Sequence, residues 1–241
     1  MQVAGKTILL TGGTDGIGRE LAGQLKAKGA TVIVTGRTPE RIDAAKAAGY
    51  EVIAADLSSQ AGVEAILAAV KDRDIDILIN NAGLGSDHDF REAMPDLADN
   101  DRCIAANLNA PIHLITHLMP VLRARPEAMI VNVTSGLAIA PRSGGPIYCA
   151  TKAGLRSYTL ALRHQLRDTA IHVLEVLPPV VETKLTAGRG GKNKMPAPEC
   201  AAQIVDAIET NVKEANVGMT KLLRIVESLS PALARKIMIK Y

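Results

Sequence analysis

The chain has 241 residues, a formal net charge of +3, 47% hydrophobic residues and 22% charged residues. This balance is typical of a globular protein with one sizeable core and excludes a disordered chain. The scattered basic residues and an aromatic content of only 2% exclude a dedicated nucleic-acid-binding protein, which needs a basic face or stacking platforms.

The three cysteines are odd in number and widely spaced, at Cys103, Cys149 and Cys200. They form neither a disulfide framework nor a CxxC metal site. His113 and His117 are four residues apart, but no acidic companion completes a zinc-protease motif, so we predict no metal site. No charged leader precedes the first apolar segment, and no run reaches the ~18 apolar residues that span a bilayer. We expect a soluble cytoplasmic protein without a spanning membrane segment.

Short apolar segments alternate with longer helical ones along the chain. Because each segment is nearly all apolar, it is typical of a strand that is buried on both faces of a parallel sheet. The pattern predicts an α/β fold and a single domain over residues 1–241, with a Rossmann-type doubly wound parallel sheet in three α/β/α layers. The predicted strands are Thr7–Leu10, Thr31–Val34, Glu51–Ala54, Ile75–Ile79, Met129–Val133 and His172–Leu177.

A glycine-rich turn, Thr11–Gly18, joins the first predicted strand to an amphipathic helix. Glycines at such a turn let the backbone approach a pyrophosphate, and the helix N-terminus offers it free N–H groups. The spacing Gly-x3-Gly-x-Gly resembles the TGxxxGxG motif of the short-chain dehydrogenase/reductase family. The resemblance implies that the cofactor contacts Gly12, Thr14, Asp15, Gly16, Ile17 and Gly18.

The end of the second predicted strand bears on the choice of cofactor. NAD-binding members of the family carry an acidic residue where this chain has Gly36, and Arg37 follows it. A missing carboxylate and an arginine that can pair with a 2′-phosphate favour NADP(H) over NAD(H). Asp15 argues the other way, because a carboxylate near that phosphate costs affinity unless it points to solvent.

Two further segments match cofactor-binding elements of the family at the ends of the third and fourth strands. Asp56, followed by Leu57, matches the aspartate that contacts the adenine, although it is equally a simple helix cap. Asn80 begins an NNAG element whose Asn81, Ala82 and Gly83 line the cofactor. Both lie where α/β folds bind ligands.

The catalytic candidates follow in the second half of the chain. Tyr148 and Lys152 are four residues apart on a predicted helix, so they share a face, and a nearby cation favours the phenolate. They match the YxxxK motif of the family. Ser135 ends the fifth predicted strand, where the family places its catalytic serine, and Asn107 matches the fourth residue of the tetrad, in preference to Asn109.

The resemblance spans nearly Met1 to Thr183 and implies hydride transfer between a nicotinamide and a carbonyl or alcohol substrate. Tyr148 would be the general acid/base, Lys152 would bind the nicotinamide ribose, Ser135 would polarise the oxygen, and Asn107 would position a water. Val181 and Thr183 would contact the nicotinamide carboxamide. The same resemblance implies a homodimer or homotetramer.

The chain departs from the family after the sixth strand. Pro179 replaces the usual glycine, as in a branch named for D-alanine esterification, and the strand that usually ends in a Val-Asp-Gly signature is absent. Residues 186–198 are rich in glycine and proline and are predicted to form a mobile substrate lid. Residues 220–241 are predicted to be an amphipathic helical extension. Its apolar stripe, which is a core or subunit contact or alternatively a membrane-surface face, comprises Leu222, Val226, Leu229, Leu233 and Ile237.

Two alternative functions remain at this point. Ser135 beside Tyr148 and Lys152 could act as the nucleophile of a cofactor-independent esterase or hydrolase. A non-catalytic nucleotide sensor would need the glycine loop but has no use for a proton relay.

Overall fold

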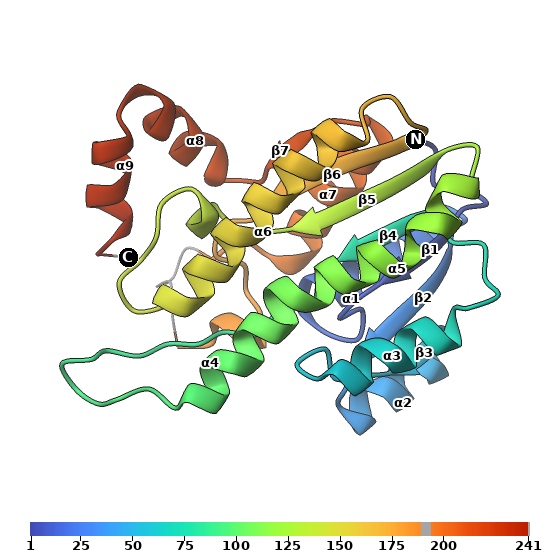
Figure 1. Cartoon of the computed structure of the whole chain (residues 1–241), viewed down its shortest axis with the longest axis horizontal. Helices are drawn as coiled ribbons and strands as arrows, with labels where there is room; N and C mark the ends of the chain where they lie inside the picture. Colours follow the sequence, from blue (N-terminus) through green and yellow to red (C-terminus); the bar gives the residue numbers. More distant parts are fainter. Residues whose placement is uncertain (189–193, 241) are drawn as a thin grey trace.

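The computed structural model describes residues 1–188 and 194–240. These residues form one sheet of seven parallel strands in the order β3-β2-β1-β4-β5-β6-β7. Helices cover both faces of this sheet (Figure 1), so the predicted three-layer Rossmann-type fold is confirmed. The strand order reverses between β1 and β4, and a crevice opens at such a point beyond the carboxyl ends of the strands.

The strands are β1 (Thr7–Leu10), β2 (Thr31–Gly36), β3 (Glu51–Ala54), β4 (Ile77–Asn80), β5 (Ala128–Val133), β6 (Ile171–Leu177) and β7 (Glu214–Asn216). The α-helices are α1 (Gly16–Ala27), α2 (Pro39–Ala47), α3 (Gln60–Ala69), α4 (Leu97–Ile104), α5 (Ala110–Ala124), α6 (Pro146–Gln165), α7 (Ala197–Glu209), α8 (Thr220–Leu229) and α9 (Pro231–Met238). The short π-helix η1 (Ala105–Asn109) joins α4 to α5, and the 3-10 turns η2 (Gly136–Ala138) and η3 (Lys184–Thr186) follow β5 and β6.

Two hydrophobic cores hold the layers together, one on each face of the sheet. Leu21 of α1 and Ile204 of α7 pack with one face, and Ile66 of α3 and Leu114 of α5 pack with the other. All four side chains are fully buried. The central strands β1, β4 and β5 are therefore covered on both sides, which is why their sequences show little alternation of apolar and polar residues.

The six strands predicted from the sequence are present, with ends that differ by no more than two residues. The prediction that no strand follows β6 in the last part of the chain is wrong. The three-residue strand β7 pairs with β6, with Glu214 opposite Glu175 and Asn216 opposite Leu177. Its sequence is short and polar, so the strand forms because of its neighbours and not because of its own β-propensity.

The C-terminal extension contains two helices instead of one continuous helix. Ser230 separates α8 from α9, and its hydroxyl caps α9 by accepting a hydrogen bond from the Leu233 N–H at 3.3 Å. Figure 1 shows both helices beyond the carboxyl ends of β5 and β6, outside the body of the sheet. Within residues 1–188 and 194–240, no helix is both long enough and apolar enough to cross a membrane.

Candidate active site

The glycine loop between β1 and α1 is shaped by positions that a side chain could not occupy. Gly12 and Gly16 have φ angles of +66° and +52°, in the left-handed region that favours glycine. A Cβ on Gly18 would lie 2.1 Å from the Gly12 carbonyl oxygen. The backbone is therefore tight and open on its outer side, as close approach of a pyrophosphate requires.

The first turn of α1 is available to an anion. Asp15 is the N-cap residue, but its side chain makes no capping hydrogen bond to that turn. Its carboxylate instead lies 2.5 Å from Nη1 of Arg41 on α2. The amide groups of the first turn and the positive end of the helix dipole thus face the cavity described below, which fits a phosphate group.

The loop after β4 is attached to the glycine loop through Thr11. The Thr11 hydroxyl accepts hydrogen bonds from the backbone N–H groups of Asn81 and Ala82, both at 3.0 Å, and donates to the Ile79 carbonyl at 3.3 Å. The Asn81 side-chain amide donates to the Thr11 carbonyl at 3.0 Å. These bonds fix the NNAG segment beside the glycine loop, at the crevice between β1 and β4.

Two arginines lie near the end of β2. Arg37 Nη1 is 3.6 Å from Asp56 Oδ2, and Arg41, which the sequence analysis did not single out, pairs with Asp15. Partial burial opposes ionisation of Asp56, but hydrogen bonds from Ser58 and the charge of Arg37 hold the pKa of Asp56 below its ordinary value. A Cβ on Gly36 would lie 2.4 Å from Thr14 Oγ1, so this position has no room for an acidic side chain unless Thr14 moves.

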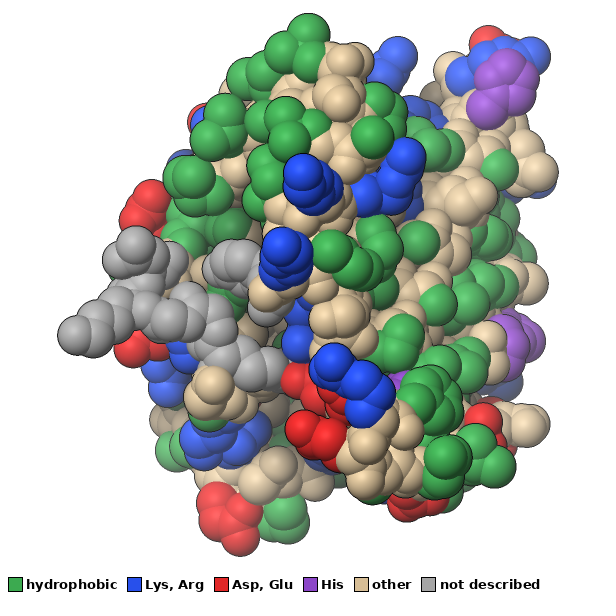
Figure 2. Space-filling model, turned by 90° about the vertical axis from the view of Figure 1, so that its left-hand side faces the viewer, with side chains coloured by type: hydrophobic (Ala, Val, Ile, Leu, Met, Phe, Trp, Pro, Cys, Tyr) green, Lys and Arg blue, Asp and Glu red, His purple; other side chains and the backbone are tan. Residues whose placement is uncertain are grey.

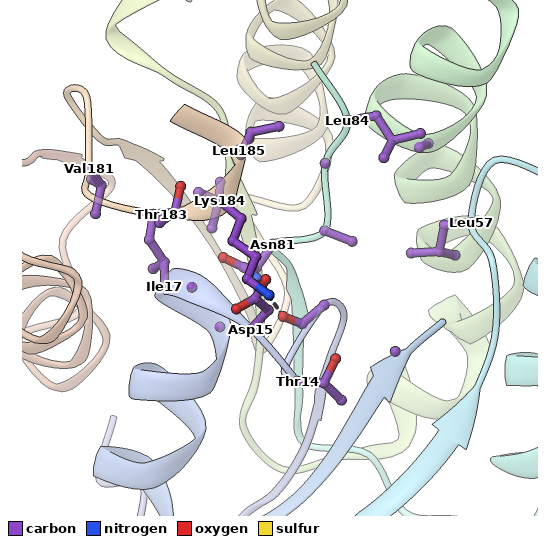
Figure 3. A pocket seen from close by; sticks show the side chains of 18 of the residues that line it. Thr14, Asp15, Ile17, Leu57, Asn81, Leu84, Val181, Thr183, Lys184 and Leu185 are labelled. Atoms are coloured by element: carbon purple, nitrogen blue, oxygen red, sulfur yellow. Dashed lines mark hydrogen bonds between the residues drawn. The ribbon is translucent and has the colours of Figure 1, made fainter. Parts of the chain in front are cut away.

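A cavity of about 480 Å³ runs along these elements. Figure 3 shows Asp15 and Ile17 at the start of α1, with Thr183 and Lys184 crossing above them. Lys184, on η3, is a second lining residue that sequence reasoning missed. Every residue that the sequence analysis assigned to the cofactor lines this cavity: Gly12, Thr14, Asp15, Gly16, Ile17, Gly18, Arg37, Asp56, Leu57, Asn81, Ala82, Gly83, Tyr148, Lys152, Val181 and Thr183.

Lys152 lies at the inner end of the cavity. Its side chain is only 3% exposed, and Nζ donates a hydrogen bond of 2.8 Å to the Val133 carbonyl at the end of β5. Burial lowers the pKa of Lys152 from 10.5 to about 8. Nζ is also 5.8 Å from the centre of the Tyr148 ring.

Asn107 lies in the π-helix η1 between α4 and α5, where each backbone hydrogen bond spans one residue more than in an α-helix. Its fully buried side chain accepts a hydrogen bond from the Leu84 N–H at 2.8 Å and donates to the Leu84 carbonyl at 2.8 Å. The side-chain amide also donates to Thr151 Oγ1 at 3.2 Å. Asn109 is exposed, whereas the Asn107 side chain holds the loop after Gly83 in place.

Ser135 and Tyr148 lie where two cavities meet. Both side chains line the first cavity and also a second one of about 740 Å³, which extends toward α8 and α9. Ser135 is the second residue after β5, and its hydroxyl accepts a hydrogen bond from the Leu137 N–H at 3.1 Å. A substrate in the second cavity could therefore reach a ligand in the first one at these two side chains.

The segment after β6 forms the border between the two cavities. Pro178 and Pro179 line both of them, and Val181 bridges to Met195. A Cβ on Gly218 would lie 3.4 Å from Pro179 Cγ. Pro179, which replaces the usual glycine, therefore packs just before the C-terminal extension. Of the predicted lid over 186–198, residues 189–193 lie outside the described residues, and its role stays a prediction.

The cysteines and two histidines line neither cavity, although Cys103 Sγ accepts a hydrogen bond of 3.3 Å from the Asn107 side chain. Cys103, Cys149 and Cys200 are buried and free, and burial raises the pKa of each thiol, that of Cys200 to about 12. His113 and His117 are exposed on α5. Among the described residues, no three His, Cys, Asp or Glu side chains are grouped so that they could hold a metal ion.

Comparison with known proteins points to one family. The short chain dehydrogenase family profile matches residues 6–194. An uncharacterized oxidoreductase from Bacillus subtilis named DltE is 42% identical over 189 residues, which cover 77% of this chain and 75% of that protein. A serine 3-dehydrogenase from Rhizobium radiobacter is 35% identical over 193 residues, which cover 78% and 77% of the two chains. A crystal structure of a short chain dehydrogenase from Burkholderia cenocepacia J2315 in complex with NADP superimposes with a TM-score of 0.87 at 25% identity, and the match covers 99% of both chains.

Proposed function

The chain belongs to the short-chain dehydrogenase family, and from this premise we propose that it is an NADP(H)-dependent oxidoreductase acting on a carbonyl or alcohol substrate. The observation that carries the proposal is the meeting of the two cavities at Ser135 and Tyr148, with Lys152 beside the tyrosine. An esterase has no need for the first cavity, and a nucleotide sensor has no need for the second.

In this proposal each side chain has one task. The nicotinamide, when bound in the first cavity, supplies or accepts the hydride. Tyr148 donates a proton to the carbonyl oxygen or removes it from the alcohol, and the Lys152 ammonium stabilises its phenolate. Ser135 donates a hydrogen bond to the substrate oxygen, and Asn107 keeps the loop beside Lys152 in position.

The preference for NADP(H) over NAD(H) is supported by the charges at the end of β2. Arg37 and Arg41 both line the first cavity, and each is paired with a carboxylate that a 2′-phosphate could replace or share. The Asp15 carboxylate in the glycine loop is paired with Arg41, so its negative charge is compensated and repels a 2′-phosphate less. We further propose a homodimer or homotetramer, on the resemblance alone.

The first experiment is a titration of the protein with NADPH and with NADH. The chain contains no tryptophan, so the change in nucleotide fluorescence on binding is measured without tryptophan emission. We expect tighter binding of NADPH and NADPH-dependent reduction in a panel of ketones and aldehydes. Binding of neither nucleotide, together with ester hydrolysis in their absence, would instead support the hydrolase.

The catalytic assignment is tested with Tyr148→Phe. This substitution removes the hydroxyl that exchanges the proton and leaves the ring, so turnover should fall at least ~1,000-fold while the Kd for NADPH changes less than about threefold. Tyr158→Phe, on the same helix and outside both cavities, is the matched control and should keep full activity. Unchanged turnover in Tyr148→Phe would contradict the assignment.

A further inference from the structure

The second cavity is the larger of the two that meet at Ser135 and Tyr148. Its volume is about 740 Å³, within the range of sites that enclose a drug-sized ligand. One end is formed by Ser135 and Tyr148, and the other end by the C-terminal helices. Among the described residues, the apolar side chains of its wall are Leu137, Pro178, Pro179, Val180, Leu185, Met219, Leu222, Leu223, Val226, Ile237 and Met238.

The helices α8 and α9, together with Met219 just before α8, leave large apolar side chains exposed over this cavity. Leu222 is 52% exposed, Ile237 is 53% exposed and Met219 is 68% exposed, although all three line the cavity. Figure 2 shows hydrophobic side chains gathered over the upper part of this face, where Figure 1 places α8 and α9. Contact of this apolar surface with water is unfavourable, and an apolar ligand that displaced the water would relieve that cost.

The described part of the wall carries little charge. Arg142 is the one charged side chain among the described residues that line this cavity. Its guanidinium is paired with Asp87, and its side chain is only 13% exposed. A substrate carboxylate would have to compete with Asp87 for this cation. The described wall therefore offers no ready site for an anionic or zwitterionic substrate.

We propose that this cavity binds an uncharged, extended apolar substituent of the substrate, so that the enzyme acts on a carbonyl or alcohol group near one end of a long hydrocarbon chain. The inference rests on the proposed function, since the reacting group must lie between Ser135 and Tyr148. The C-terminal helices are then the wall that selects the substrate. Small charged hydroxy acids such as serine, for which one similar protein is named, would be poor substrates.

The first test is a homologous series of methyl ketones from butanone to dodecan-2-one, assayed with NADPH. Each methylene that the cavity buries should raise kcat/KM about fourfold, until the chain reaches the end of the cavity. The ketone 11-oxododecanoate has the same chain with a terminal carboxylate, and it should be a worse substrate than dodecan-2-one. A flat series, or faster reaction with the carboxylate or with serine, would overturn the proposal.

The second test locates the subsite with matched pairs of variants. Leu222→Gln and Ile237→Gln change exposed side chains that line the cavity. Ile225→Gln on α8 and Leu233→Gln on α9 change side chains that are 56% and 48% exposed and do not line it. We expect each lining variant to lower kcat/KM for dodecan-2-one about tenfold more than for butanone, and each control to leave both values within a factor of two. Equal effects in the lining variant and its control would mean that the hydrocarbon chain of the ketone does not bind in the second cavity.

Calorimetric binding of dodecan-2-one in the presence of NADP⁺ separates this proposal from the proposed function. If no ketone is reduced, the oxidoreductase proposal fails, but binding that weakens in Leu222→Gln and not in Ile225→Gln still supports an apolar subsite. If butanone and serine are turned over and dodecan-2-one does not bind, the oxidoreductase proposal stands and the apolar subsite is overturned.

Discussion

Lys152 combines a structural cost with its proposed catalytic role. Its ammonium is buried and has one hydrogen bond, to the Val133 carbonyl, and burial lowers its pKa from 10.5 to about 8. Below pH 8 the group is charged in both the folded and the unfolded chain, so the folded state carries the full penalty. Between pH 8 and 10.5 only the unfolded chain stays charged, and the penalty declines. The folded protein is therefore less stable than it would be without the buried ammonium beside Tyr148.

Replacing Lys152 by methionine should therefore stabilise the protein while abolishing activity. The pKa shift corresponds to about 3 kcal/mol, and loss of the hydrogen bond to Val133 takes back about 1 kcal/mol. We expect a net gain of about 2 kcal/mol in the free energy of unfolding at pH 7, which shrinks as the pH rises from about 8 to 10.5. Urea unfolding at several pH values measures this, with the exposed Lys71→Met as the control. A loss of stability at pH 7 would show that the hydrogen bond outweighs the burial.

Arg41 is the residue at which the choice of cofactor can be tested most directly. Without its guanidinium, the Asp15 carboxylate would remain in the cavity uncompensated, so Arg41→Ala should weaken NADPH binding at least tenfold. NADH has no 2′-phosphate, so its binding should weaken clearly less than that of NADPH. Fluorescence titration gives both constants, and Arg73→Ala, which removes an exposed guanidinium outside the cavity, is the control. An equal loss for both nucleotides would remove Arg41 from the 2′-phosphate site.

At the scale of the elements, one ionic network joins β6, α6, β7 and α8, and it is buried at its β6 end. Glu175 on β6 is fully buried, accepts a hydrogen bond from Thr134 at 2.8 Å and lies 2.6 Å from Arg156 on α6. Arg156 also contacts Glu214 on β7 at 3.0 Å, and Glu214 lies 3.3 Å from Arg224 on α8. Burial raises the pKa of Glu175, although the charge of Arg156 opposes this. The network explains why the polar strand β7 is held against the sheet.

Arg156→Met should destabilise the protein by roughly 3 kcal/mol, because it leaves the Glu175 carboxylate buried without its counter-charge. The loss should be smaller at pH 5 than at pH 7, since protonation of Glu175 removes the uncompensated charge. Adding Glu175→Gln should recover most of the stability. The exposed pair of Arg73 and Glu51 is the control, and Arg73→Met should cost less than about 1 kcal/mol in the same denaturation experiment. Equal costs for the two arginines would mean that the network adds nothing to the fold.

At the scale of the whole molecule, the first cavity joins parts that are far apart in the chain. It is lined by the loops after β1, β2, β3, β4, β5 and β6, so a nucleotide bound there would contact both halves of the sheet. Ligand binding to the folded state alone should then stabilise the entire domain.

NADPH at about 100 times its Kd should raise the free energy of unfolding by about 2.7 kcal/mol, which for a chain of this size is an increase in Tm of roughly 5–10 °C. NADH at the same concentration should raise it less. Thermal unfolding followed by circular dichroism gives both shifts. Equal shifts with the two nucleotides would contradict the preference for NADP(H), and no shift with either would contradict the cofactor site.

The amino-acid sequence by itself determined the class of fold and most of the candidate site. Apolar strands, the glycine loop, the NNAG segment and the YxxxK pair depend on residues that are close together in the chain, and their spacing follows from the geometry of one strand, turn or helix. Because parallel strands align their carboxyl ends, such local motifs come together without further information.

The tertiary structure alone decided the features that depend on contacts between distant segments. Asp15 is compensated because α2 brings Arg41 beside it, and β7 lies where β6 offers a free edge and α6 supplies Arg156. The position of α8 and α9 over the second cavity, on which the proposed substrate class depends, also could not be read from their apolar stripe. An amphipathic pattern indicates that one face of a helix is apolar. It does not indicate which surface packs against that face, since this is set by packing across the whole molecule.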